Sequence, residues 1–200
     1  MRHGISLFAV LILISLSAAA QGPVGVGAEG FHAQTHSPLD SSSFPSKWRF
    51  SIGYQYTRYN LTGSPFNTTG FNGSASRFFN NWFGLEGEGG FGEGQTGTTT
   101  VPANLTVKSL FISGGPRLFR RYGRLEGWVH ALGGVQHFRF NQTAGELGSN
   151  TGAAALVGAG VDFRFSRDLT FAGEADQLGT RLFGGYERHF QVVTSLTFRY

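Results

Sequence analysis

The sequence predicts an all-β fold, an eight-stranded antiparallel transmembrane β-barrel with a flexible amino-terminal segment. From residue 47 onward, apolar and polar side chains alternate in segment after segment, as they do in strands with one face toward lipid and one toward a lumen. After the first 20 residues, no stretch is as long and apolar as the roughly 20-residue segment that a membrane helix needs. The final segment alternates over its whole length and ends on an aromatic residue. Its apolar row is Phe190, Val192, Thr194, Leu196, Phe198 and Tyr200.

The amino terminus has the features of a secretory signal peptide. Arg2 and His3 precede an apolar run at 5–16, and small residues follow up to Ala20, where cleavage is expected. The run is too short to span a bilayer. Residues 21–46 have no usable period and are rich in Gly, Ser, Pro and His, which predicts a flexible periplasmic tail. We therefore expect a signal peptide at 1–20, a tail at 21–46 and an outer-membrane barrel at 47–200.

Composition excludes several classes of function. The chain has no Cys, which excludes disulfides, thiolate metal sites and a lipid anchor on a cleavage-site Cys. Without Arg2, 15 Lys and Arg face 12 Asp and Glu, and this small excess does not predict nucleic-acid binding. His32 and His36 lie four residues apart without a third ligand, so no metal site is predicted, and no cofactor is expected.

The first three predicted strands cover residues 47–59, 70–79 and 82–93. The first has the cleanest alternation, with an apolar row of Trp48, Phe50, Ile52, Tyr54 and Tyr56. A turn at Asn80-Asn81 joins the second to the third. In the third, apolar residues and glycines alternate with a row that contains Glu86 and Glu88. Glycine beside large aromatic residues suits a crowded barrel wall.

The fourth and fifth predicted strands cover residues 105–119 and 122–138. Leu110 and Ile112 anchor the fourth, and Pro116 lies near its expected end, where proline is tolerated. The faces of the fifth are ambiguous, because Trp128 shares a face with charged neighbours. The arginines around the intervening turn, interpreted as periplasmic rim charges, are Arg117, Arg120, Arg121 and Arg124.

The last three predicted strands cover residues 151–165, 168–178 and 188–200. The first of these separates an apolar row from Asp162 and Arg164, and the next places apolar residues opposite Glu174 and Asp176. The connections between all eight strands alternate in length. Long ones are expected at 60–69, 94–104, 139–150 and 179–187, and tight ones at 80–81, 120–121 and 166–167. Long outer loops and short periplasmic turns are typical of outer-membrane barrels, and a surface ligand would bind in the loops, although no residue identifies it.

The direction of the apolar rows decides between two kinds of barrel. A soluble barrel such as a lipocalin would point them inward around a ligand. The absence of disulfides, the aromatic residues near the row ends and the aromatic final strand favour the membrane. The charged residues then form a polar network in the lumen, in which carboxylates pair with arginines because an unpaired buried charge is costly. The predicted network is Arg49, Glu86, Glu88, Asp162, Arg164, Glu174, Asp176 and Arg199.

The segment 158–166, with Glu174-Ala175-Asp176 and the terminal aromatic strand, resembles the outer membrane protein β-barrel domain family, small barrels related to the transmembrane half of outer membrane protein A. Residues 81–87 and 114–117 look like further matches, and the resemblance covers about 47–200. It implies a bacterial outer-membrane location with lipid as a partner. Phe198 and Tyr200 resemble the family's aromatic assembly signal, which implies the barrel assembly machinery as another partner.

These features predict a non-enzymatic barrel with a structural or surface-interaction role and a lumen closed by charged pairs. One alternative is a porin-like channel for small solutes. A second is a lipid A modifying enzyme, in which His130 with Glu126 would activate Ser113. No diagnostic spacing supports such a triad, so no catalytic residue is predicted.

Overall fold

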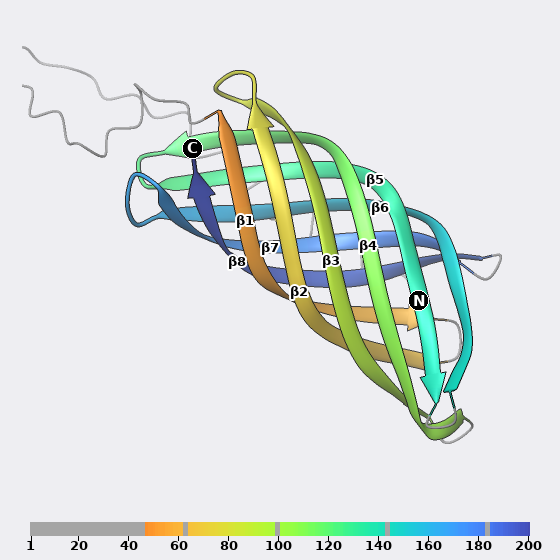
Figure 1. Ribbon diagram of the computed structural model, residues 1–200. Helices are drawn as coiled ribbons and strands as arrows, with labels where there is room; N and C mark the ends of the chain where they lie inside the picture. The colour runs from red at the N-terminus through yellow and green to blue at the C-terminus, as the bar shows by residue number, and fades with distance from the viewer. Residues whose placement is uncertain (1–46, 62–63, 99–100, 143–144, 183–184) are drawn as a thin grey trace, which may run out of the picture. The chain divides into compact units, whose positions relative to one another are not determined.

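The computed structural model describes residues 47–61, 64–98, 101–142, 145–182 and 185–200. They form a closed barrel in which every strand is antiparallel to its neighbours in the chain and β8 pairs with β1 (Figure 1). The strands are β1 (Trp48–Leu61), β2 (Ser64–Phe78), β3 (Phe83–Thr98), β4 (Val101–Tyr122), β5 (Leu125–Gln142), β6 (Gly145–Arg164), β7 (Leu169–Leu182) and β8 (Gly185–Arg199). Within the described ranges, no helix is long and apolar enough to cross a bilayer. The expected signal peptide and tail lie outside these ranges.

The eight-stranded antiparallel barrel predicted from the sequence is confirmed. Its first and last strands close the sheet in the register Phe50 opposite Phe198 and Ile52 opposite Leu196. The Trp48 N–H donates to the Tyr200 carbonyl at 3.1 Å, and the Tyr200 N–H donates to the Trp48 carbonyl at 3.0 Å. We call the end where these residues meet the terminal end, and the opposite end the far end.

The strands are longer than predicted, and most of each expected long loop is strand. β1 continues to Leu61 and β2 begins at Ser64, within the loop expected at 60–69. β4 begins at Val101, within the loop expected at 94–104. The predicted strand ends were wrong because the prediction ended each strand where its apolar row ended. Paired strands that extend beyond the hydrocarbon layer of the membrane can carry polar side chains on their outer face.

The turn expected at Arg120-Arg121 is also misplaced. β4 runs on to Tyr122, which pairs with Leu125, so that Gly123 and Arg124 form the turn. Gly123 has φ 60°, the left-handed conformation that tight hairpins require. At the turn expected at Asn80-Asn81, the Asn80 side-chain oxygen accepts a hydrogen bond from the Phe83 N–H at 2.7 Å.

Pro116 lies in the interior of β4 rather than near its end. The pairing of β4 with β5 passes from Gly114 opposite Gly133 to Arg117 opposite His130, and Pro116 has no partner on this side. Proline has no N–H to donate to the ladder, so a local interruption accommodates it.

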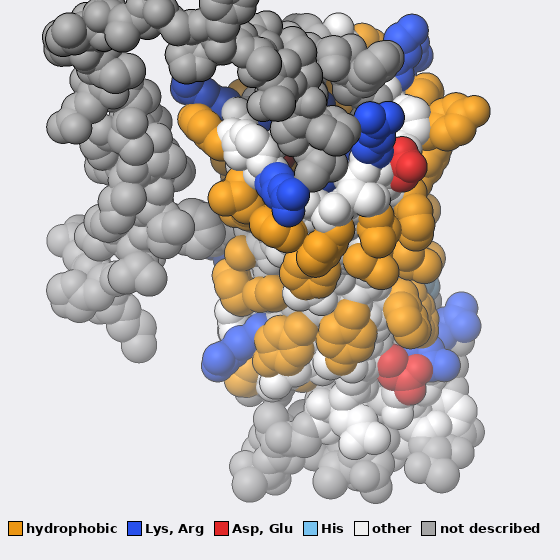
Figure 2. Space-filling model, turned by 90° about the vertical axis from the view of Figure 1, so that its left-hand side faces the viewer, with side chains coloured by type: hydrophobic (Ala, Val, Ile, Leu, Met, Phe, Trp, Pro, Cys, Tyr) orange, Lys and Arg blue, Asp and Glu red, His pale blue; other side chains and the backbone are white. Residues whose placement is uncertain are grey.

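The outer surface of the barrel is apolar. Figure 2 shows a broad band of hydrophobic side chains on one face, with charged side chains gathered toward its two ends. Ile52 and Phe71 are 61% and 69% exposed, whereas Gln55 and Thr57 of β1 are fully buried. The apolar rows therefore point outward, as in a membrane barrel and unlike a lipocalin.

Candidate functional site in the barrel lumen

A hydrophobic cluster fills part of the lumen. Its buried members are Tyr59, Phe66, Val107, Leu132, Phe138, Leu156 and Leu178. The Tyr59 ring packs on Phe66 and Phe138, with ring centroids 5.1 and 4.9 Å apart. Tyr59 and Phe66 lie toward the far ends of β1 and β2. The prediction did not include this cluster, because several of its members fall in or beside expected loops.

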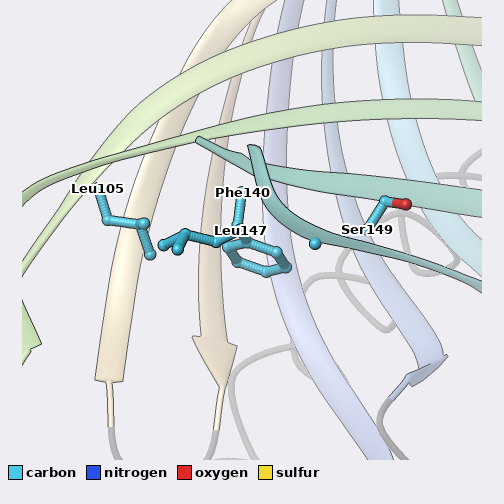
Figure 3. Close-up of a pocket in the computed structure, with 5 residues that line it drawn as sticks. Leu105, Phe140, Leu147 and Ser149 are labelled. Atoms are coloured by element: carbon cyan, nitrogen blue, oxygen red, sulfur yellow. The ribbon is translucent and has the colours of Figure 1, made fainter. Parts of the chain in front are cut away.

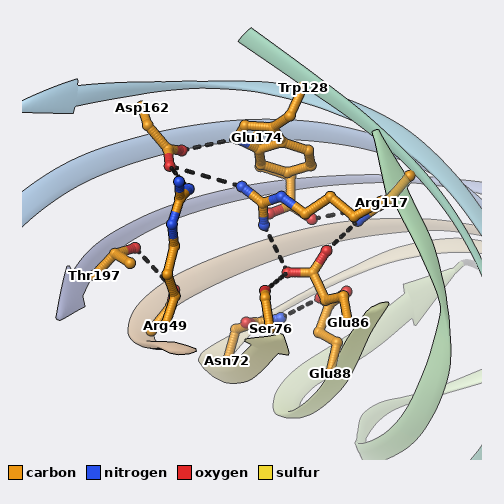
Figure 4. Close-up of polar contacts among 12 residues, drawn as sticks. Arg49, Asn72, Ser76, Glu86, Glu88, Arg117, Trp128, Asp162, Glu174 and Thr197 are labelled. Carbon is orange, nitrogen blue, oxygen red and sulfur yellow. Dashed lines mark hydrogen bonds and ion pairs between the residues drawn. The ribbon is translucent and has the colours of Figure 1, made fainter. Parts of the chain in front are cut away.

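Charged and titratable side chains fill the lumen nearer the terminal end, and Arg49 is central among them (Figure 4). We call this set the charged layer; it consists of Arg49, Glu86, Glu88, Arg117, Glu126, His130, Asp162, Glu174, Asp176 and Arg199. The Arg49 guanidinium donates to both carboxylate oxygens of Glu126, with Nη2 to Oε2 at 2.6 Å, and Nη1 donates to Asp162 Oδ2 at 3.0 Å. It also lies over the Phe78 ring, 4.3 Å from the centroid. Bidentate pairing and stacking on an aromatic face both use the planar guanidinium, so a lysine could not replace Arg49.

Arg117 forms the second centre of the charged layer. Its Nη1 donates to Glu86 Oε1 at 2.7 Å, and its Nη2 lies 3.7 Å from Asp162 Oδ2. The guanidinium lies 3.8 Å from the centre of the Trp128 ring, and the Trp128 indole N–H donates to Asp162 at 2.7 Å. Figure 4 shows Arg49 and Arg117 approaching Asp162 from two sides. Arg117 is therefore a buried lumen residue and not the rim charge expected from its place near a turn.

His130 lies among carboxylates. Its Nδ1 is 3.1 Å from Glu86 Oε2, and its Nε2 is 3.2 Å from Asp176 Oδ1 and 3.7 Å from Glu174 Oε1. Glu88 accepts a hydrogen bond from the Asn72 amide at 2.5 Å. One donor atom each from Glu88, His130 and Glu174 lies within 4.8 Å of the others, a set of ligand types that binds divalent metal ions.

The eight residues expected in the polar network occupy different places in it. Those buried in the lumen are Arg49, Glu86, Glu88, Asp162, Asp176 and Arg199, and those partly buried are Arg164 and Glu174. Arg199 donates from Nε to Thr170 at 3.0 Å and lies 3.9 Å from two carboxylates. Arg164 is half-buried, and its Nε has no hydrogen-bond partner.

Sequence reasoning left four titratable residues out of the network that contact it in the structure, namely Arg117, Arg121, Glu126 and His130. The alternation of faces along β5 would have identified two of them. Val129 faces outward, so Glu126 and His130, at odd separations from it, face the lumen. The catalytic alternative required His130 to contact Ser113. The Ser113 hydroxyl has no hydrogen-bond partner, and both His130 ring nitrogens face carboxylates, so the nucleophile–base contact is not formed.

A separate open pocket of about 330 Å³ is lined by residues of β4, β5 and β6 (Figure 3). Its lining is mainly apolar and consists of Leu105, Phe140, Leu147, Gly148 and Ser149. None of these residues is titratable, so the pocket contributes nothing to the charged layer.

No protein-family model and no curated protein matches the sequence. Solved structures do match. Ail, the attachment invasion locus protein of Yersinia pestis, in complex with the heparin analogue sucrose octasulfate, is 19% identical with a TM-score of 0.56 over 76% of this chain and 97% of Ail. Neisserial surface protein A is 8% identical with a TM-score of 0.60 over 78% of this chain and 98% of that protein. At these identities the likeness establishes the fold alone, and the chain has the fold of the small bacterial outer-membrane barrels.

Proposed function

We propose that this protein is a non-enzymatic barrel of the bacterial outer membrane, with a closed lumen and a structural or surface-interaction role. The observation that carries the proposal is the filling of the lumen by two kinds of contact. Paired charges occupy it nearer the terminal end, and the cluster around Tyr59 and Leu156 occupies it toward the far end. A conducting pore would need a continuous path for water past both.

We infer the orientation in the membrane from the hairpins, which extend beyond the apolar rows at the far end as the outer loops of such barrels do, and from the signal peptide proposed at 1–20. Export delivers the chain to the periplasm, and the terminal end then faces the periplasm while the far end faces outward. Phe198 and Tyr200 lie at the terminal end and are 52% and 91% exposed, which supports the proposed role of this segment as an assembly signal.

Single-channel recording tests the closed lumen against the porin-like alternative. The refolded protein, identified by a change in gel migration on heating, should be electrically silent in planar bilayers. Glu86→Ala should also be silent, because the hydrophobic cluster still blocks the far end. Reproducible wild-type conductance would overturn the proposal, and conductance in Glu86→Ala would assign closure to the charged layer alone. Lipid A from expressing cells should remain fully acylated, and deacylation that disappears in His130→Ala would support the enzyme alternative.

The surface-interaction role is supported by basic residues near the far end. Arg58, Arg181 and Arg188 are exposed on the adjacent strands β1, β7 and β8. In the register, Arg58 faces Phe190 and Arg181 faces Tyr186, and Arg188 lies between these two positions on β8. The three cations are thus close neighbours on one outward face. The Ail complex with sucrose octasulfate makes a sulfated glycan the first polyanion to test.

Heparin binding to reconstituted proteoliposomes tests this role. Binding should weaken as salt rises, and Arg181→Gln with Arg188→Gln should reduce the affinity at least tenfold. The matched control is Arg120→Gln with Arg124→Gln, which removes the same number of exposed cations at the terminal end. An equal loss of heparin affinity in the two double variants would show that heparin is attracted nonspecifically to positive charge. It would remove the support for a binding surface formed by the three far-end arginines.

A further inference from the structure

The charged layer contains carboxylates that its arginines do not neutralise. Among the described residues, Glu88, Glu174 and Asp176 make no ion pair with an arginine, and the one basic side chain close to Glu174 and Asp176 is His130. Each carboxylate also has an oxygen without a hydrogen-bond partner: Glu88 Oε2, Glu174 Oε1 and Asp176 Oδ2. Glu88 is 5% exposed and Asp176 is 0% exposed. Unpaired buried charge is costly, so a bound cation would stabilise this part of the lumen.

We propose that the lumen binds a divalent transition-metal ion through Glu88, His130 and Glu174, with Asp176 as a third carboxylate beside them. The three donor atoms lie within 4.8 Å of one another. Ligands at about 2.0–2.2 Å from Zn²⁺ lie roughly 3.5 Å apart, so small side-chain rotations would bring these donors to bonding distance. An imidazole with carboxylates suits Zn²⁺ and its neighbours better than Mg²⁺ or Ca²⁺, which prefer oxygen ligands alone.

The surroundings of His130 are those of a metal ligand. An Nδ1–H donated to Glu86 at 3.1 Å leaves the Nε2 lone pair directed toward Glu174 and Asp176. Glu86 is held in turn by Arg117 at 2.7 Å and by the Ser76 hydroxyl at 3.2 Å. A carboxylate behind the imidazole is the usual way in which a metal-binding histidine is oriented.

The ligands come from three strands that are not neighbours in the sheet. Glu88 lies on β3, His130 on β5, and Glu174 and Asp176 on β7. Space for Asp176 depends on Gly158 of β6, where a Cβ atom would lie 1.6 Å from Asp176 Oδ1. A bound ion would therefore cross-link opposite walls of the barrel and stabilise the folded state, because the unfolded chain does not assemble the site.

Metal content and metal-dependent stability test the proposal on the full-length protein. The protein is refolded in detergent with and without Zn²⁺, dialysed against a weak chelator and analysed by inductively coupled plasma mass spectrometry. About one equivalent of Zn²⁺ should be retained, and its presence should raise the unfolding midpoint in urea. Co²⁺ in place of Zn²⁺ should give the visible absorption bands of a site with nitrogen and oxygen ligands.

Variants locate the ion. Glu88→Gln and His130→Asn should each lower the retained metal at least tenfold and abolish the Zn²⁺-dependent shift. The matched controls are Glu93→Gln, an exposed carboxylate on the same strand as Glu88, and His137→Gln, and both should retain the ion. A variant with His32→Ala and His36→Ala should retain it as well, which separates the lumen from the amino-terminal histidines.

Gel migration before and after heating shows whether each variant folds. Where a variant does not fold, the metal content and the urea midpoint of the wild type still test the proposed site. A wild-type barrel that retains no Zn²⁺ and unfolds at the same urea concentration with and without it would overturn the proposal. So would equal retention of the ion in folded Glu88→Gln. Higher stability of Glu88→Gln than of the wild type, without a Zn²⁺ effect in either, would show that protons neutralise the carboxylates instead.

Discussion

Replacing Arg49 by methionine tests whether the charged layer stabilises the barrel. Arg49 is 1% exposed and joins Glu126 of β5 to Asp162 of β6. Removal of one partner from a buried ion pair leaves the other charge uncompensated and costs about 3–5 kcal/mol. Glu126 would keep Arg121 at 2.8 Å, and Asp162 would keep the Trp128 indole at 2.7 Å. We therefore expect a loss near the lower limit, about 3 kcal/mol, which is roughly a hundredfold in the folding equilibrium.

The assay is urea unfolding of the protein reconstituted in lipid vesicles, followed by tryptophan fluorescence. Arg77→Met is the matched control, because Arg77 is exposed near the terminal end, where its guanidinium lies over the Trp48 and Phe79 rings. It should change the free energy of unfolding by about 0.5 kcal/mol or less. The double variant Arg49→Met with Glu126→Gln should recover part of the loss, since it also removes the uncompensated carboxylate. A cost below about 1 kcal/mol for Arg49→Met, or a cost equal to that of the control, would refute the reasoning.

Three further substitutions test the fold. Ile52→Arg places a charge within the outward apolar row of β1 and should cost about 2–4 kcal/mol in vesicle unfolding, whereas Ile52→Leu should be nearly neutral. Gly160→Ala puts a Cβ atom 2.3 Å from the Trp128 ring, so it should lower the free energy of unfolding by about 1–3 kcal/mol and alter the near-ultraviolet circular dichroism. The control Gly173→Ala, where the added Cβ has no heavy atom within 4 Å, should leave both the stability and the spectrum unchanged. Gly123→Ala forces φ 60° on a residue with a side chain and should cost about 1–2 kcal/mol, and an unchanged urea midpoint would contradict the assigned turn.

The lipid-facing surface of the barrel was predictable because lipid constrains every second residue of a strand. Trp48, Phe50 and Ile52 alternate with lumen residues without interruption, and the structure exposes all three. The same parity predicted a lumen position for Glu86 and Asp162, and both are buried. The strand extensions toward the far end were not predictable in this way, since no apolar row marks the outer face there.

The partners within the lumen were beyond sequence reasoning. Arg49 and Glu126 lie 77 residues apart, and alternation specifies the face of a side chain but not its height or its neighbour across the barrel. Arg117 illustrates the limit. Its place near a turn suggested a rim charge, yet β4 continues beyond it to Tyr122 and carries it into the lumen.

The sheet topology has a consequence for the order of folding. All strand pairs except β1 with β8 join chain neighbours, so hairpins can add one at a time until the last pairing closes the ring. Arg49 lies on β1, whereas Glu126 and Asp162 lie on β5 and β6, on the opposite side of the ring. These charges can meet only after the sheet has curled around. Neutralisation of the interior is therefore coupled to closure, and a half-formed sheet in lipid would expose charges that its own strands cannot yet pair.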